Sequence, residues 1–166
     1  MDSIRDGSDR SMGPIRNDIE PSTRALRMDV LERFNERYPF GAHLGVEVTH
    51  VEEGYVEGRI ELDDHHSLSE STRLAHGAVA FGLADSLSAA ALASVEGAPG
   101  PTLDVRIDYL RPATGDIFGA AEVVRYGTDT GVVEVELTDA DDRRLATTRG
   151  VYKTNLVDGA NPFVDS

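Results

Sequence analysis

The chain has 166 residues, a length that fits one domain with a hydrophobic core of its own. It contains no cysteine, which excludes disulfide bonds, a thiol nucleophile and cysteine-based metal sites. The formal net charge of −14 argues against nucleic acid as a partner.

The N-terminal sequence bears on the compartment. Residues 1–17 are polar and lack the apolar segment of a secretory signal. No stretch approaches the roughly 18 apolar residues of a membrane span. We therefore expect a cytoplasmic protein that has no membrane partner.

The basic residues are unusual, because only Lys153 among the 16 is a lysine. An acidic excess with almost no lysine resembles the proteins of extreme halophiles, in which carboxylates keep the surface hydrated in molar salt. The alternative is an acidic mesophilic protein from a GC-rich genome, in which codon bias replaces lysine by arginine. Both interpretations remain open, and the first is favoured.

The N-terminal part of the chain divides at about residue 20. Residues 1–20 show no apolar periodicity and predict a disordered or loosely packed arm. From Pro21 to Pro39, apolar residues recur at intervals of three and four, which predicts an amphipathic covering helix that Pro39 closes. The residues of this stripe are Leu26, Val30, Leu31, Phe34 and Tyr38.

A hairpin should follow this helix. Residues 44–49 and 55–62 alternate between apolar and polar side chains, as strands with one buried face do. Glu52, Glu53 and Gly54 form the predicted turn between them. We expect residues 63–75 to form a polar loop.

The stretch 77–95 predicts a helix that is apolar on every side and consists mostly of alanine, glycine and serine. A soluble helix without a polar face belongs inside a domain. This helix nevertheless carries one carboxylate, Asp85. Because an unpaired buried carboxylate is costly, Asp85 is a candidate catalytic group. The structural alternative is a carboxylate that accepts a hydrogen bond from a neighbouring serine such as Ser88 or from a backbone group.

Four further strands complete the predicted domain, which spans residues 21–154. They are expected at 102–111, 116–127, 131–139 and 143–153, and residues 155–166 read as a loose tail. A single antiparallel sheet can bury one apolar helix only if it curls around that helix. The pattern thus predicts an α+β hot-dog fold, a curved antiparallel sheet wrapped around one long central helix, with an N-terminal covering helix.

Two motifs carry a resemblance to a known family. His76-Gly77-Ala78 followed by Leu83-Ala84-Asp85 resembles the HGG…LAD signature of hot-dog acyl-CoA thioesterases of the phenylacetate-pathway (PaaI-like) type. The segment 97–113, which ends in Tyr-Leu-Arg-Pro-Ala, resembles the strand that follows the central helix in that family. The resemblance covers roughly residues 38–153 and implies hydrolysis of acyl-CoA thioesters to free acid and coenzyme A.

The resemblance assigns roles to particular residues. It implies that Asp85 is the general base or the nucleophile, and that the backbone amides at Gly77 and Ala78 hold the oxyanion at the start of the helix. Ala78 departs from the family, which has a second glycine there. His76 either hydrogen-bonds the substrate or supports the loop.

Two further positions are candidates by resemblance. Glu70 stands where the family has an amide that orients water or the carbonyl, and it either serves the site as a protonated carboxyl group or faces solvent. Thr102 stands where relatives place a serine or threonine near the attacking water. An ordinary strand threonine is the alternative.

The sequence implies no metal or redox cofactor, and coenzyme A belongs to the substrate. His65 and His66 lie beside Asp63 and Asp64, but adjacent residues point apart and two more convergent ligands are lacking. Arginines near the cleft should bind the phosphates of coenzyme A, and the sequence does not choose among the candidates. These are Arg111, Arg125, Arg143 and Arg149.

An open sheet edge favours a homodimer or a dimer of dimers. In the family, each site combines residues of two subunits, so Asp85 of one chain would face Gly77 of the other. The alternative function is a non-catalytic acyl-CoA-binding or sensing protein, which Ala78 and Glu70 favour. A hot-dog dehydratase is a weaker alternative, since the motif matches thioesterases.

Overall fold

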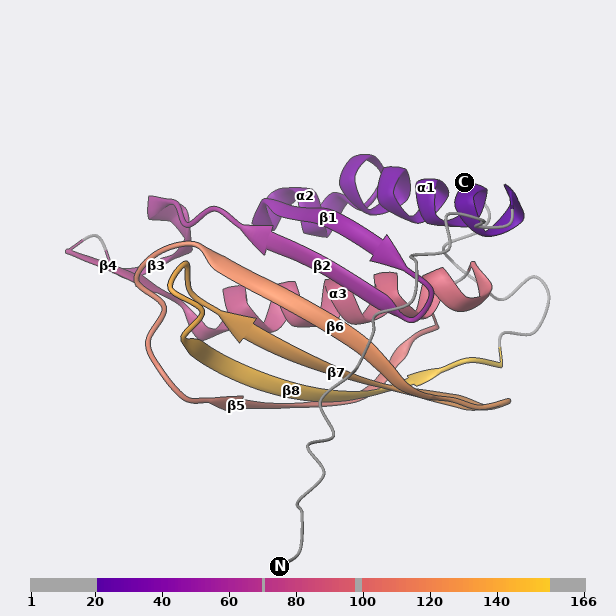
Figure 1. Cartoon of the computed structure of the whole chain (residues 1–166). Helices are drawn as coiled ribbons and strands as arrows, with labels where there is room; N and C mark the ends of the chain where they lie inside the picture. The colour runs from indigo at the N-terminus through magenta and orange to yellow at the C-terminus, as the bar shows by residue number, and fades with distance from the viewer. Residues whose placement is uncertain (1–20, 70, 98–99, 156–166) are drawn as a thin grey trace, which may run out of the picture.

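The computed structural model describes residues 21–69, 71–97 and 100–155 (Figure 1). The predicted N-terminal arm, Glu70 and all but the first residue of the predicted tail therefore lie outside the described residues. The helices are α1 (Pro21–Glu36), α2 (Pro39–Leu44), the short 3-10 helix η1 (Asp64–His66) and α3 (Gly77–Glu96). The strands are β1 (Val46–Glu52), β2 (Tyr55–Ile60), β3 (Ser67–Ser69), β4 (Thr72–Ala75), β5 (Thr102–Tyr109), β6 (Ile117–Tyr126), β7 (Thr130–Thr138) and β8 (Arg144–Lys153).

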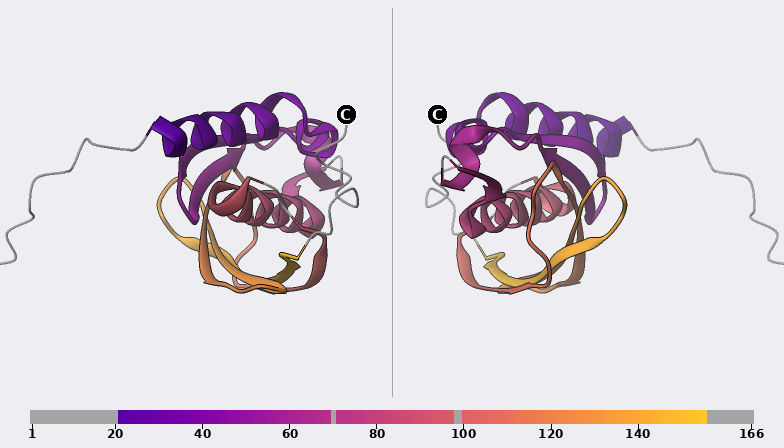
Figure 2. Two further views of the ribbon diagram at one scale, coloured as in Figure 1. Left: turned by 90° about the vertical axis from the view of Figure 1, so that its right-hand side faces the viewer. Right: turned by 90° about the vertical axis from the view of Figure 1, so that its left-hand side faces the viewer.

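Six of the strands form one antiparallel sheet in the order β1-β2-β6-β7-β8-β5. The sheet curls around α3, and α1 with α2 covers the side of α3 that the sheet leaves open (Figure 2). The predicted hot-dog fold is therefore confirmed. The predicted strands after the central helix agree with β5 to β8 to within two residues.

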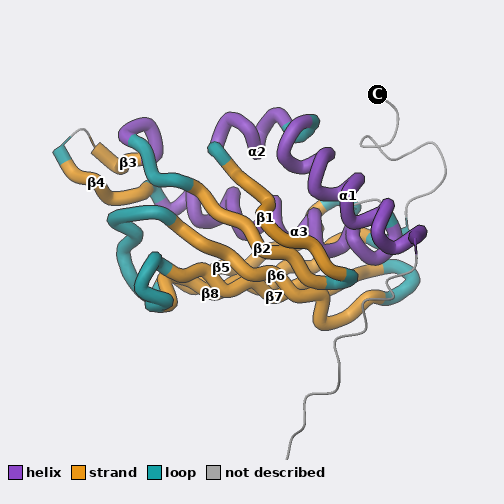
Figure 3. The backbone as a smooth tube through the Cα atoms, turned by 45° about the horizontal axis from the view of Figure 1, so that its top comes forward, coloured by secondary structure: helices purple, strands orange, loops and turns teal. Residues whose placement is uncertain are grey.

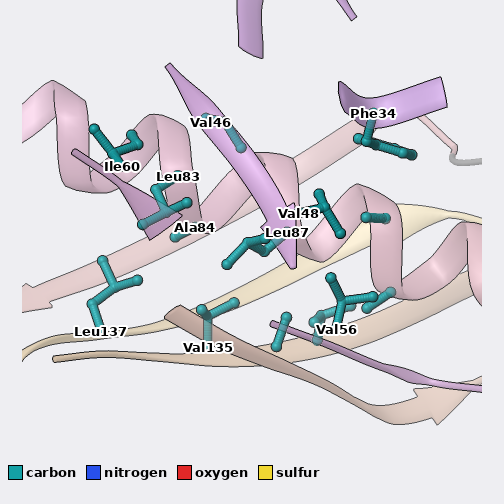
Figure 4. Close-up of a cluster of buried hydrophobic side chains, with 14 of the residues drawn as sticks. Phe34, Val46, Val48, Val56, Ile60, Leu83, Ala84, Leu87, Val135 and Leu137 are labelled. Carbon is teal, nitrogen blue, oxygen red and sulfur yellow. The ribbon is translucent and has the colours of Figure 1, made fainter. Parts of the chain in front are cut away.

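The core lies between α3 and the concave face of the sheet. Leu83, Ala84 and Leu87 of α3 pack against valines and isoleucines from the strands, and all three are completely buried (Figure 4). Gly97 ends α3 in a left-handed conformation that glycine adopts without strain. Contrary to the expectation from the sequence, α3 is long and apolar enough to cross a membrane, but most of it is buried in this core.

The N-terminal helix differs from the prediction at its end. Pro39 does not only close α1; it is also the first residue of α2, where a missing amide hydrogen costs nothing. Leu44 therefore belongs to α2, and β1 begins at Val46 and not at residue 44. Val30 and Phe34 of the predicted stripe are buried, as the periodicity indicated.

The polar segment 63–75 is not a simple loop. It contains η1 and a two-stranded hairpin, β3–β4, that stands apart from the main sheet (Figure 3). Alternating hydrophobicity cannot reveal these strands, because most of their side chains are exposed. Hydroxyl contacts of Ser69 with Ser71 and Thr72 tie the turn instead.

The two edges of the main sheet differ. The helix α1 runs along β1, where the Asn35 side chain donates to the Val48 carbonyl at 3.0 Å and accepts from the Val48 amide at 2.8 Å. This side chain satisfies backbone groups that would otherwise be open. The other edge, β5, pairs with β8 on one side only.

Candidate active site

The N-terminus of α3 is built around His76. His76 is the N-cap residue, and its Nδ1 accepts a hydrogen bond from the Ala78 amide at 3.1 Å. The backbone amide of His76 donates to the His66 carbonyl at 2.8 Å. His76 thus supports the start of the helix, which was one of its two expected roles. The Gly77 amide donates to no acceptor in the described part of the chain.

Gly77 lies in a tight position beside β5. The Tyr109 hydroxyl donates to the Gly77 carbonyl at 2.8 Å, and a Cβ atom at Gly77 would lie 3.1 Å from the Tyr109 hydroxyl oxygen. The positive end of the helix dipole and the unpaired Gly77 amide both favour a developing negative charge here. This end of α3 can therefore hold an oxyanion.

Asp85 lies two turns further along α3 and is half-buried. Its Oδ1 accepts two hydrogen bonds, from the Thr102 hydroxyl at 3.1 Å and from the Tyr152 hydroxyl at 3.2 Å. Its Oδ2 accepts none from the described residues. A carboxylate held by one oxygen and open at the other can take a proton or attack a carbonyl.

Ser88, the neighbour named as a structural partner of Asp85, hydrogen-bonds elsewhere. The Ser88 hydroxyl donates to the Ala84 carbonyl at 2.8 Å, and the Ser86 hydroxyl donates to the Gly82 carbonyl at 2.7 Å. Both serines satisfy their hydroxyl groups within α3. Asp85 is instead bound by side chains from β5 and β8.

Two tyrosines near Asp85, Tyr38 and Tyr152, are not predicted as site residues by the sequence. Burial, and then the negative charge of Asp85, raise the pKa of Tyr38. Burial is also the main cause that raises the pKa of Tyr152, to which Asp85 adds by its charge and its hydrogen bond. Both hydroxyls therefore stay protonated at neutral pH and remain donors. Tyr38 follows α1, so the covering helix also brings a side chain toward the site.

The structure brings Asp85 and Thr102 together but separates them from the helix N-terminus. His76, Gly77 and Ala78 precede Asp85 by nine, eight and seven residues, so Gly77 and Asp85 are about 12 Å apart along the axis of one helix. Glu70 lies outside the described residues. One chain by itself does not place the expected oxyanion site against its own Asp85.

His66 connects the segment that begins at Asp63 to the end of α2. It is buried, its Nδ1 accepts from the Asp63 amide at 3.0 Å, and its Nε2 lies 3.0 Å from the Leu44 carbonyl, to which it donates. Both ring nitrogens are thus engaged within the protein. Burial, followed by the neighbouring His65, lowers the pKa of His66. His66 is therefore neutral at pH 7.

This lowered pKa predicts a pH dependence of stability. Between the ordinary histidine pKa of about 6.5 and the lower folded value, the unfolded chain binds a proton that the folded chain does not. The contribution of neutral His66 to the free energy of unfolding is fully present above about pH 6.5 and decreases as the pH falls below this value. We expect the melting temperature of the His66→Gln variant, which keeps one acceptor and one donor, to fall less between pH 7 and pH 5 than that of the wild type. An equal effect of His50→Gln, at an exposed histidine, would contradict this assignment.

The four candidate arginines already have partners. Arg149 pairs with Glu134 across the outer face of the sheet, whereas Asp85 contacts its inner side. Arg143 pairs with Asp141 at 2.9 Å, and Arg111 donates to the Arg144 carbonyl at 2.7 Å. Arg125 lies 3.4 Å from the Thr130 hydroxyl. Arg149 therefore becomes the least suitable of the four for a ligand bound at Asp85.

Comparison with known proteins agrees with this fold. The profile of the thioesterase superfamily matches residues 73–146. A protein of Halobacterium salinarum whose name assigns it to the esterases is 33% identical over 125 residues, which are 66% of this chain and 80% of that protein. Human acyl-coenzyme A thioesterase 13 is 30% identical over 127 residues, which are 74% of this chain and 89% of that enzyme.

A solved structure shows the same arrangement. It is a variant of the phenylacetic acid degradation protein PaaI from Thermus thermophilus, with 29% identity and a TM-score of 0.62 over 69% of this chain and 98% of that one. Fold and relatives together define a thioester hydrolase of the hot-dog class. The chain belongs to the thioesterase superfamily.

Proposed function

We propose that this protein hydrolyses acyl-CoA thioesters to the free acid and coenzyme A. The observation that carries the proposal is the Asp85 carboxylate, whose Oδ1 is held by two hydroxyls while Oδ2 has no partner among the described residues. The name of human acyl-coenzyme A thioesterase 13 supports the choice of an acyl-CoA substrate. A panel of acyl-CoA esters, assayed by release of free thiol, tests it.

Asp85 can act in two ways. As a base, Oδ2 takes a proton from water while the water oxygen attacks the thioester carbon. As a nucleophile, Oδ2 attacks that carbon itself, and water later hydrolyses the resulting anhydride. In both cases the C–S bond breaks, and the thiolate leaves and takes up a proton. On the base route the water oxygen enters the acid, whereas on the anhydride route water that attacks Cγ of Asp85 leaves its oxygen in Asp85 and the former Oδ2 in the acid. Label that enters Asp85 during a single turnover in ¹⁸O-labelled water therefore identifies the anhydride route.

The helix N-terminus supplies the other half of the chemistry. As the carbonyl carbon becomes tetrahedral, its oxygen gains a negative charge that backbone amides can stabilise. The Gly77 amide is available for this in the described chain, whereas the Ala78 amide must first leave the His76 ring. Neither step requires a metal or redox cofactor, and we propose that the protein acts in the cytoplasm without one.

We propose that the site forms between two copies of the chain, as a homodimer or a dimer of dimers. The two halves of the site lie about 12 Å apart along one helix, which is too far for a single thioester carbonyl. Exposed apolar side chains lie on β5 and just after it, at the sheet edge that has no partner strand among the described residues: Leu103 is 57% exposed, Tyr109 54% and Leu110 50%. A second copy that pairs with β5 would cover them and could bring its Gly77 near Asp85.

One observation favours the alternative of a non-catalytic acyl-CoA-binding protein. The Ala78 amide, which the family resemblance assigns to the oxyanion, donates to the His76 ring. If this bond persists with ligand bound, the oxyanion site has one donor fewer. Saturable binding of an acyl-CoA without thiol release would support this alternative.

The charge distribution predicts a dependence on salt. The chain has 30 carboxylates against 16 basic residues, and Glu122 and Glu134 stand directly opposite each other on neighbouring strands. Salt screens this repulsion, with a Debye length of about 3 Å at 1 M. We expect loss of folded structure or of assembly below roughly a few hundred millimolar KCl. A melting temperature that is the same in low and molar KCl would count against a halophilic protein.

A further inference from the structure

Tyr152 links β8, the last strand along the chain, to the candidate base Asp85. It lies near the end of β8, 67 positions from Asp85 in the chain, and is 1% exposed. Its hydroxyl donates to Asp85 Oδ1 at 3.2 Å. Thr102, the other donor to this oxygen, is exposed at the start of an edge strand. Tyr152 is therefore the more rigidly placed of the two donors.

Gly150 explains how the Tyr152 ring reaches this position. The two residues lie two positions apart on β8 and share its buried face. A Cβ atom at Gly150 would lie 2.5 Å from Cε2 of Tyr152 and 2.6 Å from its hydroxyl oxygen. The ring thus lies across the space that a side chain at Gly150 would fill. Glycine in the interior of a strand weakens it, and such a close approach is a common reason for its presence.

We propose that Tyr152, seated over Gly150, is a positioning residue that fixes the orientation of the Asp85 carboxylate. With Thr102 it holds Oδ1 and so directs Oδ2 toward the substrate. This role rests on the function proposed above for Asp85. Tyr152 itself does not touch the reacting atoms. The hydroxyl of Tyr152 is buried with the ring, which is 1% exposed, and burial keeps it protonated as a donor to Oδ1.

The test compares two tyrosines that each donate to a carboxylate. Tyr152→Phe should lower kcat about tenfold with KM unchanged, since alignment affects the chemical step more than binding. Tyr126→Phe is the matched control, because Tyr126 donates to Glu96 at the far end of α3 at 3.0 Å. That variant should keep wild-type kcat. The melting temperature should change little in either variant, since the ring remains.

A double-mutant cycle shows whether Tyr152 acts through Asp85. If it does, Tyr152→Phe should cause no further loss of turnover in an Asp85→Asn background. Gly150→Ala should reproduce the kcat loss by displacing the ring, with no added effect of Tyr152→Phe. If Gly150→Ala fails to fold, the double-mutant cycle with the conservative Tyr152→Phe still tests whether Tyr152 acts through Asp85. Equal losses in the wild-type and Asp85→Asn backgrounds would overturn the assignment.

A spectroscopic measurement separates this inference from the proposed function. The ¹³Cγ resonance of Asp85 at a fixed pH should move in Tyr152→Phe and stay in place in Tyr126→Phe. An unmoved resonance together with wild-type turnover in Tyr152→Phe overturns the positioning role while hydrolysis stands. A moved resonance in a protein that releases no thiol from any acyl-CoA confirms the contact but overturns the proposed function.

Discussion

Asp85→Asn should reduce turnover of acyl-CoA at least about a hundredfold, within the range that loss of a general base costs. The amide keeps an acceptor oxygen for the hydroxyls of Thr102 and Tyr152 but can neither take a proton nor attack the thioester. Stability should hold or rise, because a neutral amide is easier to bury than a carboxylate. Thiol release and thermal melting measure the two effects.

The controls for this variant use other carboxylates. Asp108→Asn removes an exposed carboxylate of β5 that pairs with Arg106, and it should leave turnover unchanged. Glu70→Gln, which restores the amide found in the family at that position, should have a small effect or raise activity. The assignment is wrong if Asp85→Asn unfolds the protein while Glu70→Gln abolishes turnover. Asp85 would then be structural.

Mixing two inactive variants should restore activity if each site combines two chains. Asp85→Asn lacks the base, and Gly77→Val places a branched side chain against Tyr109 and beside the proposed oxyanion amide. In a dimer of one chain of each kind, one site has both Asp85 and Gly77 and the other has neither. Random pairing makes about half the dimers mixed, so co-expression should give about a quarter of wild-type activity.

Sites contained within single chains would give a different result. No chain in the mixture carries both Asp85 and Gly77, so activity would not exceed the residual level of the two variants. Co-expression of Asp85→Asn with the double variant Asp85→Asn/Gly77→Val provides the matched control, since neither chain then supplies the base. It should stay inactive in either arrangement.

The sequence predicts the parts of the fold that rest on local periodicity. The apolar helix α3 and the alternating strands β5 to β8 are long, and their patterns are strong. The sequence predicts a helix end at Pro39 and no new helix, because a proline that ends one helix and a proline that begins another give the same local signal. The hairpin β3–β4 has no buried face and therefore no alternation to detect.

The candidate site was predicted as far as local motifs extend. Asp85 stood out as a charge in an apolar helix, and the resemblance pointed to Thr102. Tyr152 was not foreseen, because the strand pairing and curvature that bring the end of β8 over α3 are properties of the whole sheet. The one local sign is Gly150, because a glycine inside a strand indicates that another group, here the Tyr152 ring, packs closely against the backbone.

The contrast between the two sheet edges limits how these molecules can polymerise. The side-chain amide of Asn35 already hydrogen-bonds the backbone carbonyl and amide of Val48 on β1, so these two groups cannot pair with a further strand. Among the strands that the structure describes, β5 is then the one edge through which the sheet can grow. Two chains that join there by a twofold axis use up both open edges, and the outer strands of the pair are both β1. In the proposed dimer, extension of the sheet would therefore stop at two chains, which would protect a protein rich in β-structure from forming open-ended fibres at high concentration.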